Sequence, residues 1–270
     1  MNKITRVVPW YGSKASLTDW IIPFFPEHKV YVEPFGGGAN VLLNKKPCEF
    51  EVYNDLDSNL VNFFRVLRNN SDELIRLIEL TPYSREEYLN AFEPTDCPIE
   101  ATRRFYVRCW QGRGGKGKSN QQGGWFCMST CVGGKGGNNM TKWNNINNVR
   151  NVTLRIRNTY LEHDDAFKII PRFDSKDTLF YIDPPYCSDK LSRKYNHQLS
   201  QDDQVKLAEL LHNVQGYVVL SGFDSDLYQE LYGDWHKETK EVLTRRKGKR
   251  TECLWLSPNI APPAKQLPMF

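Results

Sequence analysis

The chain has 270 residues, 40% hydrophobic and 25% charged, which suits one large globular domain with an insertion or two modest domains. No apolar run approaches the ~20 residues that cross a bilayer, and no signal-peptide segment precedes the first motifs, so we expect a cytoplasmic protein without a membrane partner. The net charge of +4 is unevenly spread, because residues 101–157 hold eleven Lys and Arg and no Asp or Glu.

Short apolar runs and helix-like stretches alternate along the chain. Runs rich in Val, Tyr, Phe and Ile, too short for helices, predict strands buried on both faces at residues 30–35, 50–55, 178–185 and 216–223. Helices are predicted at residues 58–67, 72–80, 201–211 and 225–231. Residues 237–243 and 252–257 flank RRKGKR, which favours a hairpin closing the sheet's edge. This alternation predicts an α/β fold with a mostly parallel sheet.

The alternation is interrupted between about residue 56 and residue 157. Helical patterning comes first, and then a glycine-rich stretch that holds ten of the 18 glycines, followed by NNMTKWNNINN. A loop region of this composition has too little apolar content for a core. We interpret residues 56–157 as an insertion in a catalytic domain made of residues 1–55 and 158–270. Its basic charge is typical of a surface that binds a polyanion, although a solvated basic loop is the plainer alternative.

The seven cysteines are widely spaced and odd in number, as expected of reduced cytosolic thiols. Cys109, Cys127 and Cys131 are the nearest approach to a zinc-binding set. They lack a CxxC pair and a neighbouring histidine pair, so we expect no metal site.

The first chemical motif is a glycine turn after the strand at residues 30–35. Gly36, Gly37 and Gly38 lead into a short helix, and glycines there let the backbone approach a ligand closely. The spacing is not GxGxxG, so it does not indicate a dinucleotide, and such a turn also serves merely to reverse the chain.

The second motif is Asp55, at the carboxyl end of the next predicted strand and about 20 residues past the glycine turn. A carboxylate in that place can accept both hydroxyls of an unphosphorylated ribose. The alternative is that it caps the following helix, where Asp57 is an equally good cap. Together the two motifs favour a ligand that contains a nucleoside.

The third motif is DPPY, at residues 183–186, directly after a buried strand. Prolines cannot continue strand pairing, so the Asp183 carboxylate and the Pro184 carbonyl are two acceptors side by side. Two such acceptors suit an exocyclic amine, which has two hydrogens to donate. This amine is a poor nucleophile because its lone pair is delocalised into the ring, and hydrogen bonds from both of its hydrogens would make the lone pair available. Tyr186 would hold the base by stacking. A simple turn is the structural alternative for Asp-Pro-Pro.

These motifs resemble the Dam-type DNA adenine methyltransferases of the alpha group, in which an S-adenosylmethionine (AdoMet) motif, a target-recognition insertion and DPPY follow in that order. PWYGSK (9–14) is similar to the N-terminal AdoMet segment, VEPFGGGAN (32–40) to the glycine motif, and YNDLDSNL (53–60) to the ribose-binding strand end. The resemblance covers nearly the whole chain. It implies a Rossmann-like methyltransferase sheet with a mainly helical and loop target-recognition insertion.

The resemblance also implies roles for individual residues. Asp183, Pro184, Pro185 and Tyr186 would be the catalytic set. The AdoMet-binding residues would be Trp10, Lys14, Glu33, Pro34, Phe35, Gly36, Gly37, Gly38, Asp55, Asp165 and Asp183. The family has an acidic residue followed by Phe that contacts the cofactor's adenine; here HDDAF places Ala166 where Phe is expected, and we favour Asp165 over Asp164.

The resemblance implies that the protein binds duplex DNA, flips out an adenine and methylates its amino group at a specific site. We expect DNA contacts from Arg113, Lys116, Lys118, Lys135, Lys142, Arg246 and Lys247, although the RRKGKR turn could equally be a solvated hairpin tip. No obligate protein partner is evident, and a monomer or weak dimer is expected. Methylation of the cytosine N4 amine, an inactive DNA-binding relative, and methylation of a protein amide are the alternatives. Association with a restriction nuclease stays open.

Overall fold

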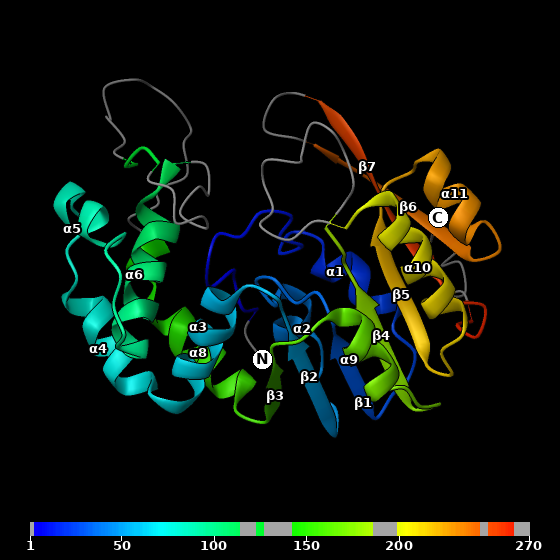
Figure 1. Cartoon of the computed structure of the whole chain (residues 1–270), viewed down its shortest axis with the longest axis horizontal. Helices are drawn as coiled ribbons and strands as arrows, with labels where there is room; N and C mark the ends of the chain where they lie inside the picture. The colour runs from blue at the N-terminus through cyan, green and yellow to red at the C-terminus, as the bar shows by residue number, and fades with distance from the viewer. Residues whose placement is uncertain (1–2, 114–122, 127–141, 186–198, 244–247, 262–270) are drawn as a thin grey trace, which may run out of the picture. The chain divides into compact units, whose positions relative to one another are not determined.

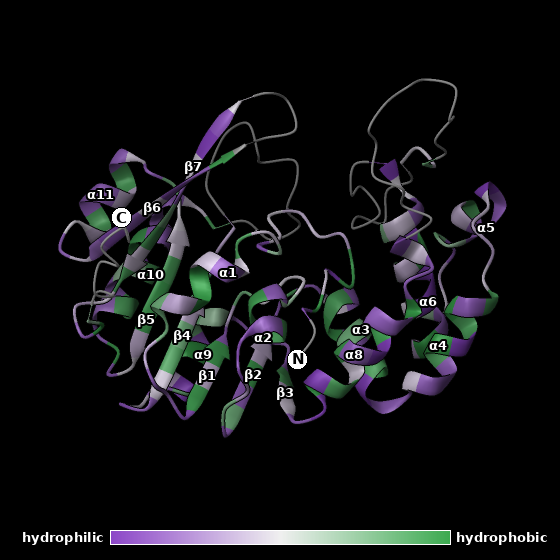
Figure 2. Cartoon of the chain, turned by 180° about the vertical axis from the view of Figure 1, so that it is seen from behind, coloured by the Kyte–Doolittle hydropathy of each residue, from purple (hydrophilic) through white to green (hydrophobic). Residues whose placement is uncertain are grey.

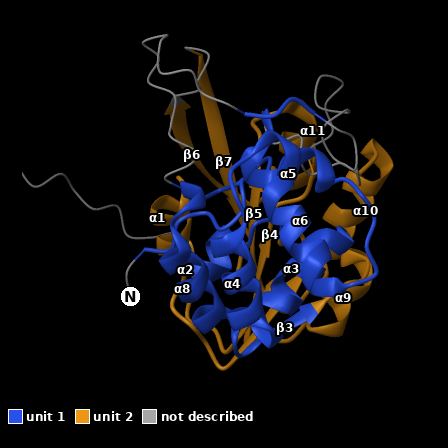
Figure 3. Ribbon diagram, turned by 90° about the vertical axis from the view of Figure 1, so that its left-hand side faces the viewer, with its two compact units in different colours: residues 1–15, 37–44, 57–161 blue, residues 16–36, 45–56, 162–270 orange. Residues whose placement is uncertain are grey.

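The computed structural model describes residues 3–113, 123–126, 142–185, 199–243 and 248–261. These residues form two compact units, shown in different colours in Figure 3. Unit 1 comprises residues 1–15, 37–44 and 57–161, and unit 2 comprises residues 16–36, 45–56 and 162–270. Each unit is described separately below. The predicted boundaries at residues 55 and 158 fall close to two of these divisions, and the assignment of a catalytic domain and an insertion stays a prediction.

The strands form a seven-stranded sheet with the order β3-β2-β1-β4-β5-β7-β6, and all of them except β3 lie in unit 2 (Figure 1). The strands are β1 (Val30–Glu33), β2 (Phe50–Asn54), β3 (Thr159–Glu162), β4 (Thr178–Ile182), β5 (Tyr217–Gly222), β6 (His236–Leu243) and β7 (Lys249–Leu256). β1 pairs in parallel with β2 and β4, and β4 with β5. β7 runs antiparallel to both β5 and β6. The predicted parallel core and terminal hairpin are therefore confirmed.

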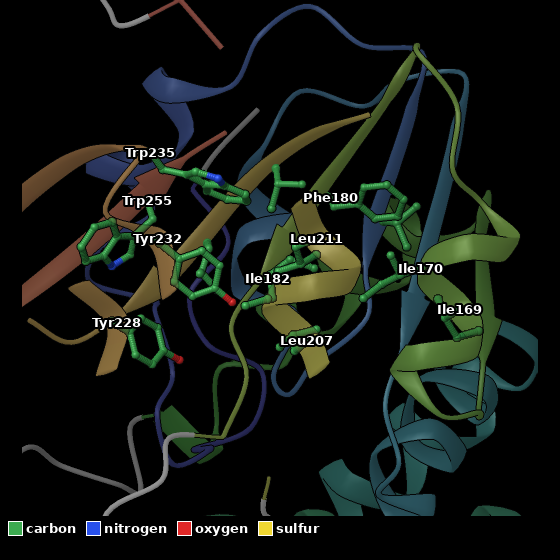
Figure 4. Packing of buried hydrophobic residues seen from close by; sticks show 14 of the residues in the cluster. Ile169, Ile170, Phe180, Ile182, Leu207, Leu211, Tyr228, Tyr232, Trp235 and Trp255 are labelled. Atoms are coloured by element: carbon green, nitrogen blue, oxygen red, sulfur yellow. The ribbon is translucent and has the colours of Figure 1, made fainter. Parts of the chain in front are cut away.

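The central strands are buried on both faces. β4 is buried at every residue, and Figure 2 shows hydrophobic residues concentrated in this part of the sheet. Three helices cover one face: α9 (Ala166–Arg172), α10 (Gln201–His212) and α11 (Asp226–Tyr232). Their apolar residues pack with Phe180, Ile182 and Trp255 in the cluster drawn in Figure 4. α1 (Thr18–Ile21) and the 3-10 helix η1 (Ile22–Phe24) precede Phe25, whose ring contacts Tyr31 and Tyr181 of the strands.

Unit 1 is built mainly of helices. They are α2 (Asn40–Asn44), α3 (Ser58–Asn69), α4 (Ser71–Leu80), α5 (Arg85–Asn90), α6 (Pro98–Gln111) and α8 (Ile146–Ile156). Their polar faces alternate with buried apolar ones, as expected of amphipathic helices around a shared core (Figure 2). None of the helices in the described part of the chain combines the length and apolar character that a membrane span requires.

The predicted elements agree with the observed ones, within a few residues at their ends. The four helices and four strands predicted from the apolar pattern are present, as are the short helix after the glycine turn and the two strands of the hairpin. The sequence analysis placed no element at α1 or α9. It also did not predict β3. This strand has four residues, and only Thr159 is buried, so neither a continuous apolar run nor a clear alternation identifies it.

Candidate active site

Four strand ends meet at one edge of the sheet in unit 2. Because β1, β2, β4 and β5 are parallel, the residues that follow them lie at the same edge. Val32 pairs with Phe180, so Asp183 lies level with Phe35, each of them three residues further along. Ile182 pairs with Leu220, which places Asp183 level with Ser221 at the end of β5. The DPP segment therefore leaves the sheet between the ends of β1 and β5.

Gly36 turns the chain closely over β2. Its N–H donates to the carbonyl of Asn54 at 2.8 Å. A Cβ at this position would lie 2.2 Å from Cε2 of Tyr53, which no real side chain tolerates. Gly36 is therefore required for packing against β2, the strand that leads to Asp55, and the predicted close approach of a ligand to this backbone stays a prediction.

The amide of Asn54 connects three of the predicted cofactor-binding segments. Asn54 is fully buried, and its Nδ2 donates to the Pro34 carbonyl at 2.8 Å and to the Asp164 carbonyl at 2.9 Å. Its Oδ1 accepts from the N–H of Asp164 at 2.9 Å. The segment after β1, the end of β2 and the turn before α9 are thus held together by one side chain. The sequence analysis missed Asn54; the signal was an asparagine, which is disfavoured in strands, inside an apolar run.

Asp57, not Asp55, caps the helix that follows β2. The Asp57 side chain accepts from the Asn59 N–H at 3.0 Å, at the N-cap of α3. Asp55 is half-buried, directly after the last residue of β2. Of the two roles considered for Asp55, capping α3 is therefore taken by another residue, and the ligand-binding role stays a prediction.

Asp165 is the N-cap of α9. Its Oδ1 accepts from the Phe167 N–H at 3.0 Å. Asp164, the residue not favoured, pairs with Lys168 and Arg172 at 3.2 and 3.1 Å. Its pKa is lowered mainly by the hydrogen bond from the Asp165 N–H and then by these cations. The Asp165 carboxylate therefore caps the first turn of α9. Its contact with a nucleoside stays a prediction.

Glu33 belongs to a buried cluster of charged side chains. The Tyr31 hydroxyl donates to Glu33 Oε1 at 2.7 Å. Burial, followed by the nearby Glu33 charge, raises the pKa of Tyr31 well above its ordinary value, so the phenol keeps the proton that it donates. The Lys45 ammonium lies 4.4 Å from the centre of the Tyr31 ring and 2.6 Å from Glu51 Oε1. The hydrogen bond from Tyr31 therefore orients Glu33, the glutamate that precedes the glycine turn.

In unit 1, Trp10 packs against the second half of the glycine motif. A Cβ at Gly37 would lie 3.0 Å from Cδ1 of Trp10, and Gly37 has a φ of +49°, which favours glycine. Gly38 lies beside the same tryptophan. Lys14 is buried, and its Nζ donates to the Gly12 carbonyl at 3.4 Å. The structure thus brings Trp10, Gly37 and Gly38 together, and the cofactor roles that the resemblance implied for them stay predictions.

The DPP segment follows β4 directly. Asp183 is half-buried, and Pro184 is buried. β4 ends at Ile182, one residue before Asp183, in agreement with the prediction that the prolines stop strand pairing. Tyr186, the predicted stacking residue, lies outside the described residues.

Only two of the predicted DNA contacts fall within the described residues. Arg113 and Lys142 are both exposed. The N–H of Arg113 donates to the Gly124 carbonyl at 2.8 Å, so Gly124 lies beside the end of α6. Lys116, Lys118, Lys135, Arg246 and Lys247 lie outside the described residues.

Comparison with known proteins identifies the reaction. The family model of the D12 class of N6 adenine-specific DNA methyltransferases matches residues 10–247. The type II methyltransferase M1.LlaDCHI of Lactococcus lactis subsp. cremoris is 26% identical over 276 residues, which cover 91% of this chain and 92% of that protein. The DNA N-6-adenine-methyltransferase of Escherichia phage P1 is 34% identical over 71 residues, 26% of this chain and 9% of that protein.

These matches confirm the expected enzyme and its substrate base. They favour adenine over the cytosine alternative and an active enzyme over an inactive relative, and the seven-stranded sheet agrees with the expected methyltransferase fold. The chain belongs to the D12 class of N6 adenine-specific DNA methyltransferases.

Proposed function

We propose that this methyltransferase uses AdoMet as the methyl donor and transfers the methyl group to a flipped adenine at the carboxyl edge of the unit 2 sheet. The family gives the reaction, and the assignment of residues is our proposal. The observation that supports it best is the position of Asp183 and Pro184 at the end of a fully buried parallel strand, beside the segments that Asn54 holds together.

The Asp183 carboxylate and the Pro184 carbonyl accept the two hydrogens of the adenine amine. Its lone pair is delocalised into the ring, and accepting both hydrogens draws the nitrogen toward a tetrahedral geometry with the lone pair available. Tyr186 stacks on the base. After methyl transfer the nitrogen carries a positive charge, and its surplus proton leaves through the Asp183 carboxylate.

The residues of unit 2 fit the proposed donor. The Gly36 turn lies at the carboxyl edge of the sheet with the Tyr53 ring packed against it, and Asp55 follows β2 with its capping alternative taken by Asp57. A carboxylate in this position suits the two hydroxyls of a ribose. AdoMet, when bound, supplies a sulfonium methyl group whose C–S bond breaks with the electron pair staying on sulfur. We assign Glu33, Pro34, Phe35 and Gly36 to its methionine half and Asp165 to its adenine.

We further propose that the protein belongs to the Dam-type subgroup and that residues 56–157 recognise the target DNA. The order of the motifs supports this, as does the basic charge of residues 101–157. The cofactor roles of Trp10, Lys14, Gly37 and Gly38, and a monomeric or weakly dimeric state, remain predictions from the resemblance.

The test is a methylation assay with AdoMet and unmethylated plasmid DNA, followed by nucleoside mass spectrometry and mapping of the modified bases. We expect N6-methyladenine in one short sequence context. AdoMet binding is measured in parallel by calorimetry, where Asp55→Ala should abolish the heat of binding and Asp57→Ala, which removes the cap of α3, should not. Equal binding by wild type and Asp55→Ala would overturn the assignment of the ribose site.

The role of the basic segment is tested by neutralising Lys116 and Lys118 together. Removal of each lysine–phosphate interaction should reduce the slope of log K against log salt by about 0.9, and binding to all DNA sequences should weaken alike. An unchanged slope would show that these lysines merely solvate the segment.

A further inference from the structure

Gln204 is a buried amide that bonds to the catalytic motif. It lies in the first turns of α10 and is fully buried. Its Nε2 donates to the carbonyl of Pro185 at 3.3 Å, and its Oε1 accepts from the Tyr228 hydroxyl at 3.2 Å. A chain of two hydrogen bonds therefore runs from α11 through α10 to the second proline of the DPPY motif.

The buried face of α10 shows why an amide at this position needs an explanation. The buried residues of the helix are Gln204, Leu207, Ala208 and Leu211, at the spacing of one helical face. An apolar side chain would continue the stripe at position 204, whereas a buried amide costs free energy unless its groups are hydrogen-bonded. The hydrogen bonds to Pro185 and Tyr228 supply that compensation.

The bond to Pro185 acts on the most adjustable part of the DPP segment. The proline rings fix φ at Pro184 and Pro185, and Asp183 and Pro184, each preceding a proline, are restricted to extended conformations. The dihedral ψ of Pro185 has neither restriction. A hydrogen bond at the Pro185 carbonyl fixes the peptide plane that this dihedral rotates, and that plane joins the predicted amine acceptors to residue 186.

Tyr228 is itself held in place by the end of the neighbouring strand. A Cβ at Gly222 would lie 2.5 Å from Cε1 of Tyr228, so only glycine at the last residue of β5 admits the ring. Ile182 pairs with Leu220, so Gly222 lies level with Pro184, each two residues further along. The rings of Tyr228 and Tyr232 lie 5.6 Å apart, and both belong to the apolar cluster drawn in Figure 4. Packing against Gly222 therefore fixes the Tyr228 ring, and with it the hydroxyl that donates to Gln204.

We propose that Gln204 is a positioning residue for methyl transfer, which holds the DPP segment in its reactive conformation through the Pro185 carbonyl, with Tyr228 orienting its amide. The proposal rests on the proposed roles of Asp183 and Pro184. It adds two residues that do not touch the substrate and act only through the main chain of the motif.

The primary test compares Gln204→Leu with the wild type in steady-state methylation kinetics. Leucine fills the same stripe of α10 but has no donor for Pro185. Misplacement of a catalytic group by about 1 Å costs about 100-fold in rate, so we expect kcat to fall by about 10- to 100-fold. The Kd for AdoMet and the KM for DNA should each change by less than about threefold, because no group that touches either ligand is removed.

The control is Asp203→Ala, on the same helix. Asp203 forms the capping box of α10 with Ser200 on the exposed side, so its loss destabilises the helix without touching Pro185. We expect a lowered Tm and an unchanged kcat. A Gln204→Leu enzyme whose kcat falls no further than that of Asp203→Ala would overturn the proposal.

Tyr228→Phe provides a second, milder variant should Gln204→Leu fail to fold. It keeps the ring against Gly222 and removes only the hydroxyl, so we expect kcat to fall about threefold to tenfold. If Tyr228 acts through Gln204, the double variant should be no slower than Gln204→Leu alone. If the double variant loses kcat by the product of the two single losses, or if Tyr228→Phe keeps the kcat of the wild type, Tyr228 does not act through Gln204. Absence of methylation by the wild type would instead refute the proposed function.

Discussion

Asn54→Ala is the substitution that tests the arrangement of the candidate active site most directly. It removes three hydrogen bonds at once, two donated to the carbonyls of Pro34 and Asp164 and one accepted from the Asp164 N–H. The backbone of β2 is otherwise undisturbed, because alanine fits any strand. The effect therefore reports on the amide alone.

The expected loss of stability follows from the burial of each partner. The bond to Pro34 is fully buried, so its carbonyl would be left unsatisfied at a cost of about 1–3 kcal/mol. The two hydrogen bonds to Asp164 are partly buried, so its carbonyl and N–H can bond to water instead. Losing each of these bonds should cost about 1 kcal/mol. The sum, about 3–5 kcal/mol, is a large share of the roughly 5–15 kcal/mol that stabilises a domain.

Two measurements separate folding from binding. Denaturant unfolding should show the lower midpoint, and calorimetry at a temperature where the variant is still folded should show AdoMet binding weakened at least about tenfold. Weaker binding is expected because the Asn54 amide no longer holds the three predicted cofactor-binding segments together. Each tenfold increase in Kd corresponds to about 1.4 kcal/mol of binding free energy.

Asn148→Ala is the matched control for this experiment. Asn148, in α8 of unit 1, likewise bonds through both ends of its amide, to the carbonyl and the N–H of Thr5, each at 3.0 Å. We expect it to lose stability without losing AdoMet affinity. The reasoning fails if Asn54→Ala binds AdoMet within twofold of the wild type, or if both variants lose affinity alike.

Three further substitutions test separate parts of the molecule. Asp183→Ala should keep AdoMet binding and lower turnover by several orders of magnitude, and single-turnover assays with near-normal rates would exclude it as the amine acceptor. Gly36→Ala should impair both folding and AdoMet binding, because its Cβ would lie 2.2 Å from the ring of Tyr53; a variant with wild-type Tm would contradict this. Lys45→Met leaves the Glu51 carboxylate buried without its cation, 2.6 Å away in the wild type, and should cost about 3–5 kcal/mol in unfolding experiments.

The sequence predicted the fold well where burial alone determines the element. β1, β4 and β5 are continuous apolar runs, and a strand buried on both faces has no other pattern. β3 was missed because it is short and mostly half-exposed or exposed. The competition between Asp55 and Asp57 for the cap of α3 could not be decided from residue types, since both are good caps, and only the geometry of the turn distinguishes them.

The positions of the candidate site were predictable to the strand ends but not to the side chains that support them. Asp183 and Asp55 stand next to apolar runs, where an acid is conspicuous. Asn54 and Gln204 act through partners 110 and 19 residues away in the chain, and no periodicity links them to those partners. The sequence signal for Asn54 and for Gln204 is weak, because it consists only of a polar residue at a position where the pattern predicts an apolar one.

Both of these buried amides bond to the carbonyl of a proline, Pro34 and Pro185. A proline that follows a strand has no N–H for the ladder, so its segment is less firmly tied to the sheet than other strand ends are. A neutral amide can hold the carbonyl without adding charge near Asp55 and Asp183, whereas a lysine or arginine in the same place would compete for these carboxylates. We infer that the prolines, which end the strands and expose the acceptors, also create the need for Asn54 and Gln204. Exchanging the amide at position 204 for a cation should therefore fail to restore the activity that Gln204→Leu loses, although Gln204→Arg keeps a donor for Pro185.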